Sequence, residues 1–224
     1  SSPVGYTVTA ENESTRTYTV TVTVAPPASV NLTEVWAFTN VKGNLADAED
    51  GAGASFFTAD GQNRSVGLSS TAAYVHDNND KVHVLSLTDG SWTATLDRGV
   101  IGGGSVNLLG FGISEDGIPV GANVRSNDFG WVVGQWLDES MPATSLFTFD
   151  NSGTGYRLGD KIDVVGNMGT GSGYVYATPQ GTFNDVLRFT VTNGAANTTP
   201  EVIVTTGAGV GTFGTVPSIT AVDA

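Results

Sequence analysis

The sequence has 224 residues, of which 39% are hydrophobic and 14% charged, so it can bury a core and is not globally disordered. Its formal net charge of −13 would repel phosphate backbones and anionic lipid, which argues against nucleic acid as a partner. Without cysteine the chain has no disulfide scaffold, thiolate metal site or cysteine nucleophile, and no apolar run reaches the roughly 20 residues of a membrane-spanning helix.

Residues 1–27 predict a β-hairpin. Residues 6–10 and 17–24 alternate with the period of two that is typical of half-buried strands, and residues 11–14 form a polar turn between them. The Ala-Pro-Pro-Ala sequence at 25–28 then indicates a stiff linker. Because a lone hairpin is only marginally stable in water, we expect this segment to be the remnant of an immunoglobulin-like sandwich or to pack on another part of the protein.

Residues 28–224 predict part of a β-propeller. Three stretches, 64–96, 109–149 and 161–205, each contain four short strand patterns separated by turn residues. Leu85, Trp136 and Phe189 fall at equivalent places in the three stretches, roughly 50 residues apart, which is the repeat length of four-stranded propeller blades. The expected fold is therefore all-β, with about three blades, orphan strands and the preceding hairpin.

The ends of the repeated region predict unpaired strands. Residues 34–40 are similar to the fourth strand of a blade, and residues 216–222 are similar to a first strand. Three blades and two such strands do not complete a ring of 4–8 blades. We therefore expect the sequence to be a piece of a longer protein; the alternative is that several copies complete a ring together.

Several of these segments resemble known bacterial surface proteins. Residues 6–11 and 18–22 are similar to the closing hairpin of bacterial immunoglobulin-like or cadherin-like domains. Residues 74–78, 113–117 and 187–194 resemble an uncharacterised propeller family of Bacteroidetes-type surface proteins, which often follows such a domain. The resemblance implies an exported, extracellular or cell-surface protein, and it supplies no catalytic residues. The short blade count and the vestigial immunoglobulin-like part depart from that pattern.

Two acidic clusters are candidate calcium sites, since calcium prefers oxygen ligands from such loops. The better one contains Asp47, Glu49 and Asp50, and the other contains Asp77 and Asp80 beside His76. Neither follows the spacing of the twelve-residue calcium loop, so a solvated turn is the alternative for both. We expect no cofactor, and calcium is the one ion that these two clusters would admit.

The two histidines admit more than one interpretation. His83 lies between Val82 and Val84 on a predicted strand, and a packed or edge position is its simplest interpretation. His76, with Asp77 and Asp80, is a weaker candidate metal ligand. A Ser-His-Asp triad stays open because serine and aspartate are plentiful, although no Gly-x-Ser-x-Gly elbow occurs.

One aromatic pair is a candidate binding platform. Trp36, Trp92 and Trp136 share the alternation of apolar neighbours, which predicts core positions. Trp131 instead follows Phe129 and Gly130 after the polar stretch that begins at Arg125. An exposed Phe129/Trp131 pair with Arg125 beside it would stack on sugar rings; buried packing is the alternative.

We expect a secreted or cell-surface binding or adhesion module, with a glycan or a surface protein as its partner and no catalysis. One alternative is a structural subunit of a surface layer or filament that self-associates through open strand edges, since such edges are templates for strand addition. The other alternative is a propeller hydrolase or lyase. A propeller fold alone does not decide among them.

Overall fold

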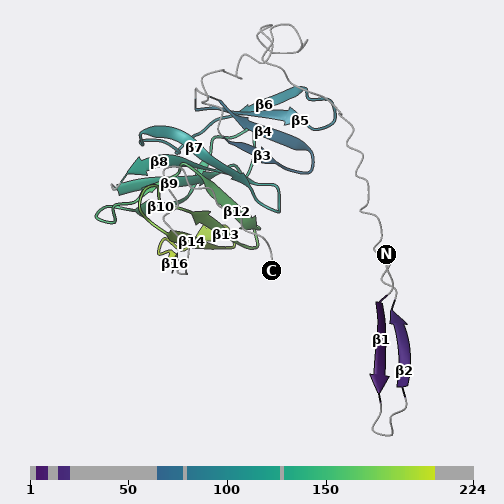
Figure 1. Cartoon of the computed structure of the whole chain (residues 1–224). Helices are drawn as coiled ribbons and strands as arrows, with labels where there is room; N and C mark the ends of the chain where they lie inside the picture. Colours follow the sequence, from purple (N-terminus) through teal and green to yellow (C-terminus); the bar gives the residue numbers. More distant parts are fainter. Residues whose placement is uncertain (1–3, 10–14, 21–64, 78–79, 127–128, 205–224) are drawn as a thin grey trace. The chain divides into compact units, whose positions relative to one another are not determined.

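The computed structural model describes residues 4–9, 15–20, 65–77, 80–126 and 129–204. Within them the protein is all-β, as predicted, and every named pair of strands is antiparallel (Figure 1). The chain divides into two compact units, Ser1–Glu34 and Val35–Ala224.

The first unit contains the predicted hairpin. Strand β1 (Val4–Thr9) pairs with β2 (Thr15–Val20), with Val4 opposite Val20 and Thr9 opposite Thr15. The Thr7 and Thr17 hydroxyls form a hydrogen bond of 3.3 Å across the pair. Threonine and valine suit this pairing because branched side chains pack well on a pleated surface. The predicted linker at residues 25–28 lies outside the described residues.

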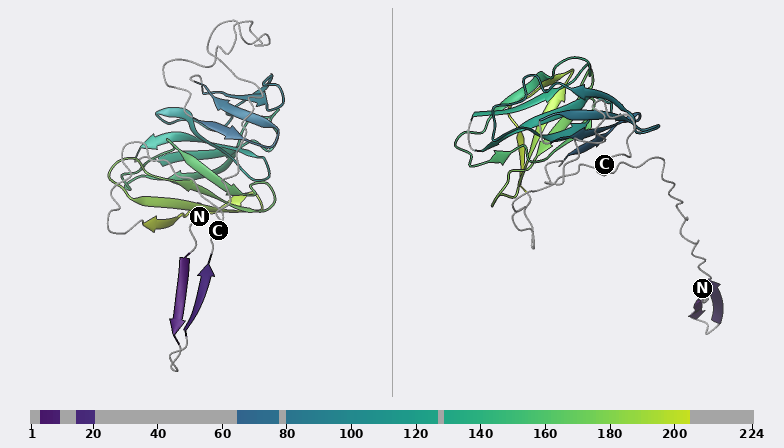
Figure 2. Two further views of the ribbon diagram at one scale, coloured as in Figure 1. Left: turned by 45° about the vertical axis from the view of Figure 1, so that its right-hand side comes forward. Right: turned by 90° about the horizontal axis from the view of Figure 1, so that it is seen from above.

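The second unit contains three sheets, each built from four strands that follow one another along the chain (Figures 1 and 2). These strands fall where the three sequence repeats predicted them. The first sheet contains β3 (Val66–Leu68), β4 (Ala72–His76), β5 (Val82–Ser86) and β6 (Trp92–Leu96). The second contains β7 (Val106–Ile113), β8 (Pro119–Ser126), β9 (Phe129–Gln135) and β10 (Thr144–Asp150). The third contains β12 (Ile162–Gly166), β13 (Ser172–Ala177), β14 (Asp185–Thr192) and β16 (Glu201–Val204).

Two short strands extend these sheets. Strand β11 (Arg157–Leu158) pairs with β8, and β15 (Ala195–Ala196) pairs with β14. The turn between β14 and β15 contains Asn193 and Gly194, with φ of 51° and 74°. Asparagine and glycine tolerate this left-handed backbone, which a tight two-residue hairpin turn requires.

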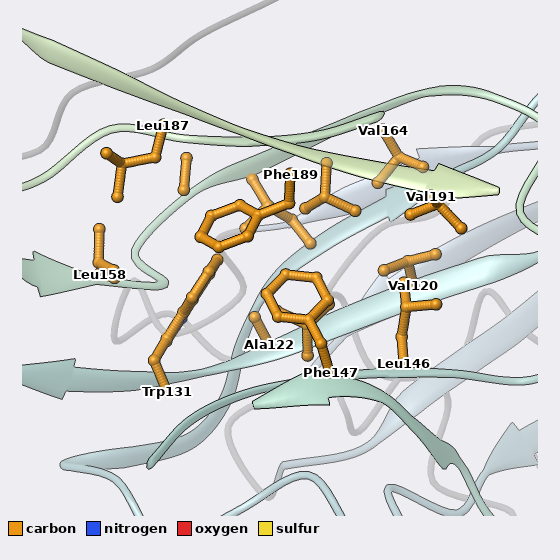
Figure 3. Packing of buried hydrophobic residues seen from close by; sticks show 14 of the residues in the cluster. Val120, Ala122, Trp131, Leu146, Phe147, Leu158, Val164, Leu187, Phe189 and Val191 are labelled. Carbon is orange, nitrogen blue, oxygen red and sulfur yellow. The ribbon is translucent and has the colours of Figure 1, made fainter. Parts of the chain in front are cut away.

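Consecutive sheets pack face to face through two apolar layers. The layer between the first and second sheets contains Tyr74, Val84, Phe111 and Trp136. The larger layer, between the second and third sheets, is centred on Trp131, Phe147 and Phe189 (Figure 3). The Phe147 and Phe189 rings stack with centroids 4.6 Å apart. The Trp131 and Phe147 rings meet in an edge-to-face arrangement with centroids 5.7 Å apart. Such offset and edge-to-face contacts are the favoured geometries of aromatic pairs.

Several predicted core residues are confirmed. Leu85, Trp136 and Phe189, assigned to equivalent places in the repeats, are all buried. Trp92 is half-buried and packs against the small cluster of Ala73, Val75 and Leu85. Trp36 lies outside the described residues.

Candidate functional site

The aromatic platform predicted around Trp131 does not form. The Trp131 side chain is fully buried in the layer between the second and third sheets, and its Nε1–H donates a hydrogen bond of 3.1 Å to the Asn123 carbonyl. The backbone of Phe129 begins β9, while its side chain lies outside the described residues. Arg125 lies on β8, where its Nη1 donates a hydrogen bond to the Gly103 carbonyl. The indole of Trp131 therefore offers no face to a ligand.

The reason for this correction is the position at which β9 begins. Strand β8 ends at Ser126 and β9 begins at Phe129, so Trp131 already belongs to the strand that follows the polar stretch. Alternation along β9 then directs Trp131 and Val133 to the same apolar layer. The sequence analysis favoured an exposed ring because Trp131 follows a polar stretch, although Trp131 in fact lies within the strand.

The candidate calcium residues fall into two groups. Asp47, Glu49 and Asp50 lie outside the described residues. Asp77 and Asp80 flank the turn between β4 and β5, but their carboxylates are engaged by different partners. Within the described part of the chain, histidine, aspartate and glutamate side chains form no group of three that could hold a metal ion. Calcium binding stays a prediction.

Asp77 instead begins a buried chain of hydrogen bonds across the first sheet. Its Oδ1 accepts from the Lys81 backbone N–H at 3.0 Å, and its Oδ2 lies 2.9 Å from Nε2 of His83. The other ring nitrogen of His83, Nδ1, lies 3.2 Å from Oγ1 of Thr95. Thr95 Oγ1 in turn accepts a hydrogen bond of 3.3 Å from Nε1–H of Trp92. These hydrogen bonds thus connect a carboxylate through an imidazole to a hydroxyl group.

Because its side chains are buried, this chain of hydrogen bonds has a defined order of donors and acceptors. Only 4% of the Asp77 side chain and 11% of the His83 side chain are exposed. A buried carboxylate favours the tautomer of His83 that carries its proton on Nε2, because that proton can then be donated to Asp77. Nδ1 is then the acceptor, and the Thr95 hydroxyl donates to it. Thr95 therefore holds its oxygen in a fixed orientation.

A cavity of about 330 Å³ opens beside Thr95 at this end of the first sheet. It is lined by Asp80, Lys81, Thr95, Leu96, Asp97 and Arg98. The turn between β4 and β5 supplies the first two residues, and the end of β6 with the segment after it supplies the rest. The residues around this one small space therefore include two acidic and two basic residues, with Thr95 and with Leu96, whose side chain is buried in the adjoining apolar layer.

Contacts with neighbouring segments hold the cavity walls in place. Asp80, with a left-handed φ of 58°, accepts a hydrogen bond of 2.7 Å from Nδ2 of Asn107 on β7. Arg98 Nη1 donates to the Ile101 carbonyl at 2.6 Å. The Asp97 carbonyl accepts from Nε1–H of Trp136 at 2.6 Å, which ties this wall to the second sheet. The walls are therefore braced by both sheets.

His76 lies near this site and is 2% exposed. Burial lowers the pKa of its imidazole below 6.5, because the charged form loses its hydration, and the nearby carboxylates of Asp77 and Asp80 oppose that effect more weakly. His76 is thus held neutral at physiological pH.

Sequence reasoning found Asp77, Asp80 and both histidines but missed the other cavity residues, which are Lys81, Thr95, Leu96, Asp97 and Arg98. For Thr95 the reason is a β-bulge. Between Val84 and Leu85 the register of β5 against β6 shifts by one residue, so that His83 pairs with Thr95 while Leu85 pairs with Trp92. Counting back from the turn without the bulge would pair His83 with Ala94. The alternation of β6 alone did not indicate which residue faces His83.

Comparisons with known proteins give a likeness of fold. No family model and no curated protein matches the sequence. No helix in the described ranges is both long and apolar enough to cross a membrane. Among solved structures, the crystal structure of a DUF4623 family protein from Bacteroides eggerthii is similar, with a TM-score of 0.57 and 12% sequence identity. The likeness covers 92% of this chain and 47% of that chain, so the chain spans about half the length of the solved protein. At this identity the likeness shows the fold alone, and it is consistent with the resemblance to Bacteroidetes-type families.

Proposed function

We propose that this chain is a binding module of the β-propeller type, in which the cavity beside Thr95 receives one sugar unit of a surface glycan. The propeller arrangement is supported by the way in which the sheets follow one another. The first strand of each sheet contacts the first strand of the next, β3 against β7 and β7 against β12. Apolar layers fill the space between consecutive sheets. Successive blades of a propeller pack in this manner.

The volume of the cavity favours a small ligand. Its volume of about 330 Å³ falls at the lower end of the range of roughly 300–1,000 Å³ for small-molecule sites. A small ligand is also what suits a site at the end of a sheet, where the turns vary freely without disturbing the core.

The residues that line the cavity favour a neutral ligand rich in hydroxyl groups. Each sugar hydroxyl both donates and accepts, so it can donate to Asp80 or Asp97 and accept from Lys81 or Arg98. The two acidic and two basic side chains balance one another, and the chain as a whole, at −13, disfavours polyanionic ligands. Hydrogen bonds that involve a charged partner are the stronger ones, which gives this site its selectivity.

Thr95 is the fixed polar group of the site. Its hydroxyl is oriented by His83 and Trp92 before any ligand arrives, so little conformational entropy is lost when a ligand binds. A hexose has about 12 non-hydrogen atoms, and at about 0.3–0.4 kcal/mol per atom the expected dissociation constant for a single unit is on the order of 1 mM.

The test is a glycan array with the full chain, followed by calorimetric titration of the best monosaccharide. Lys81→Met removes one charged donor from the cavity while its backbone N–H still bonds to Asp77, and we expect about tenfold weaker binding. Lys161→Met is the matched control, because Lys161 lies before β12 and does not line the cavity. The proposal fails if the array shows no binding, or if the two variants bind alike.

A second candidate function, hydrolysis, is favoured by one specific observation. The order Thr95–His83–Asp77 is that of nucleophile, base and orienting acid. In this scheme the Thr95 oxygen would attack an ester or glycosidic carbon while His83 accepts its proton. His83 would return that proton to the departing alcohol as the ester or glycosidic bond breaks, and water would then hydrolyse the covalent intermediate and restore Thr95. Turnover of a chromogenic ester or glycoside that disappears in Thr95→Val would establish it. Binding without turnover in the original chain would reject it.

A further inference from the structure

The Thr95 hydroxyl has three directions for hydrogen bonds, since a hydroxyl group donates once and accepts twice. Two of these directions are already taken within the first sheet. Nε1–H of Trp92 donates to Thr95 Oγ1 at 3.3 Å, and Nδ1 of His83 lies 3.2 Å from the same atom. Thr95 is only partly buried and is one of the residues that line the cavity. The third direction is therefore the one that a ligand in the cavity can use.

The state of His83 decides whether that third direction accepts or donates. The indole of Trp92 can only donate, so it always occupies one lone pair of Thr95 Oγ1. When Nδ1 of His83 is an acceptor, the hydroxyl proton of Thr95 points to it, and a lone pair is left for the ligand. When Nδ1 carries a proton, it occupies the second lone pair, and the hydroxyl proton is left instead. The tautomer of His83 thus sets the hydrogen-bonding character of Thr95 toward the cavity.

The tautomer of His83 is in turn set by Asp77. Oδ2 of Asp77 lies 2.9 Å from Nε2 of His83, and only 4% of the Asp77 side chain is exposed. A carboxylate has no proton to donate, so Nε2 must carry one. In the neutral imidazole Nδ1 is then unprotonated, and it accepts the hydroxyl proton of Thr95.

We propose that Asp77, acting through His83, makes Thr95 an acceptor toward the cavity, so that the site requires a ligand hydroxyl that donates at this position. The requirement for a donor rests on the proposed sugar binding, whereas the hydrogen-bonding state of Thr95 does not. Asp77 and His83 are positioning residues, and Thr95 is the group that selects. Fluorine in place of the ligand hydroxyl would oppose one acceptor to another, which leaves Thr95 without a partner.

Asp77 also offers a substitution that reverses this arrangement. Its Oδ1 accepts a hydrogen bond of 3.0 Å from the Lys81 backbone N–H. In Asp77→Asn the amide oxygen must keep that position, because an NH₂ group there would oppose the N–H of Lys81. The NH₂ group is then placed against Nε2 of His83 and donates to it. The proton of His83 moves to Nδ1, and Thr95 presents its own proton to the cavity.

The first measurement needs no ligand. The full chain has two histidines, and nitrogen-15 spectra of their side chains show which ring nitrogen carries the proton. His76→Gln identifies the signals of His83. At pH 8 we expect the proton of His83 on Nε2 in the original chain and on Nδ1 in Asp77→Asn. A proton on Nδ1 in the original chain overturns the proposal.

Asp89→Asn is the matched control for these spectra. Asp89 lies in the turn at the other end of β5, where its carboxylate accepts hydrogen bonds from the backbone N–H and the hydroxyl of Ser91. The substitution removes the same charge from the same sheet without touching His83. The proton of His83 should therefore stay on Nε2. A move to Nδ1 in this control would mean that Asp77 does not set the tautomer, and it would overturn the proposal.

The second measurement titrates the methyl glycosides of glucose, galactose and mannose, and their analogues in which fluorine replaces one hydroxyl at a time. At the ring position that faces Thr95, fluorine should weaken binding about tenfold in the original chain and less than about threefold in Asp77→Asn. Positions that face Asp80 or Asp97 are internal controls, because their hydroxyls donate to carboxylates in both chains and should show equal losses. Thr95→Val, which has no hydroxyl, should lose the discrimination as well.

The outcomes separate the two proposals. If the glycosides bind but each fluorinated position gives the same loss in the original chain and in Asp77→Asn, only the role assigned to Asp77 fails. If no glycoside binds the original chain, the sugar proposal and the donor requirement fail together, while the nitrogen spectra still decide the state of Thr95. If Asp77→Asn does not fold, the spectrum of the original chain and the titration of Thr95→Val decide, and equal discrimination in Thr95→Val overturns the proposal.

Discussion

The interface between the second and third sheets and the cavity end of the first sheet are built from opposite kinds of residue. The interface consists of strand interiors, where Trp131, Phe147 and Phe189 are buried in mutual contact. The cavity end consists of turns and strand ends. There the Asp77 and His83 side chains are buried, and they contact each other through Oδ2 and Nε2. Apolar burial stabilises the first region without any directional requirement, whereas burial in the second is tolerated only because each polar group has a partner.

The difference teaches that the packed interface and the cavity can be changed separately in this molecule. Changes in the aromatic interface should lower the free energy of unfolding and leave the cavity walls in place, since those walls are braced by β7 and by Trp136. Changes at the cavity should first affect the ligand binding that we propose for it.

Phe189→Ala should have the largest effect. Its ring stacks on Phe147 and lies 5.5 Å from the centroid of Trp131, with no exposed surface. Truncation would leave a cavity in a close-packed layer, and we expect a loss of about 3–5 kcal/mol in guanidinium unfolding. Leu137→Ala is the control, because Leu137 is 62% exposed and its truncation should change stability by about 0.5 kcal/mol or less. Equal losses in the two variants would contradict the assignment of the core.

Gly112→Ala should destabilise the chain by about 1–3 kcal/mol, because the added methyl group would approach Cγ2 of Val164 to 2.9 Å. The combination with Val164→Ala provides the check, since the smaller residue makes room for that methyl group. The double variant should lose less stability than the two single losses added together, by at least about 0.5 kcal/mol. Simple additivity would mean that the first strands are not in close contact.

Asp116→Asn should have a smaller effect. Asp116 follows β7, and its carboxylate accepts hydrogen bonds from Ser114 and from the backbone N–H groups of Met168 and Gly169 beside the third sheet. Desolvation raises the pKa of this carboxyl, but these hydrogen bonds together outweigh it, so the pKa lies below 3.8. We expect a loss of about 0.5–1 kcal/mol at pH 7, because solvent reaches the carboxylate and replaces part of the interaction.

The measurement for Asp116→Asn is urea unfolding, with Asp138→Asn as its matched control. Asp138 also binds a nearby backbone N–H and hydroxyl, but only within its own turn, at Ser140. No resolvable change is expected there. If both variants unfold at the same urea concentration, the bonds between the second and third sheets contribute nothing to stability.

The strands could be predicted from the sequence because their determinants are local. Alternating apolar residues, and turn pairs such as Asn193-Gly194, act over a few residues and do not depend on the rest of the fold. The core positions of Leu85, Trp136 and Phe189 rested on the same alternation, and all three residues are buried.

The site could be predicted only in part because its geometry depends on register and on strand limits. The one-residue shift at Val84/Leu85 decides that His83 meets Thr95, and the start of β9 decides that Trp131 is buried. Neither feature has a marker in the sequence as distinct as a glycine turn. The contact of Trp136 with the Asp97 carbonyl joins residues far apart in the chain, which alternation does not indicate either.

The packing of the first sheet can also be tested by varying the pH, because the titratable side chain of His76 is buried there. Burial lowers its pKa below 6.5 in the folded chain, whereas the unfolded chain takes up the proton at the ordinary value of about 6.5. The unfolded state therefore binds more protons below this pH, and stability that is complete above pH 6.5 should fall as the pH drops from 6.5 toward 5. Urea unfolding between pH 5 and 8 should show this fall in the original chain and a shallower one in His76→Gln, because the glutamine side chain does not take up a proton. Parallel curves for the two chains would mean that His76 is accessible to protons in the folded state and that this part of the first sheet is less tightly packed than the interface between the other two sheets.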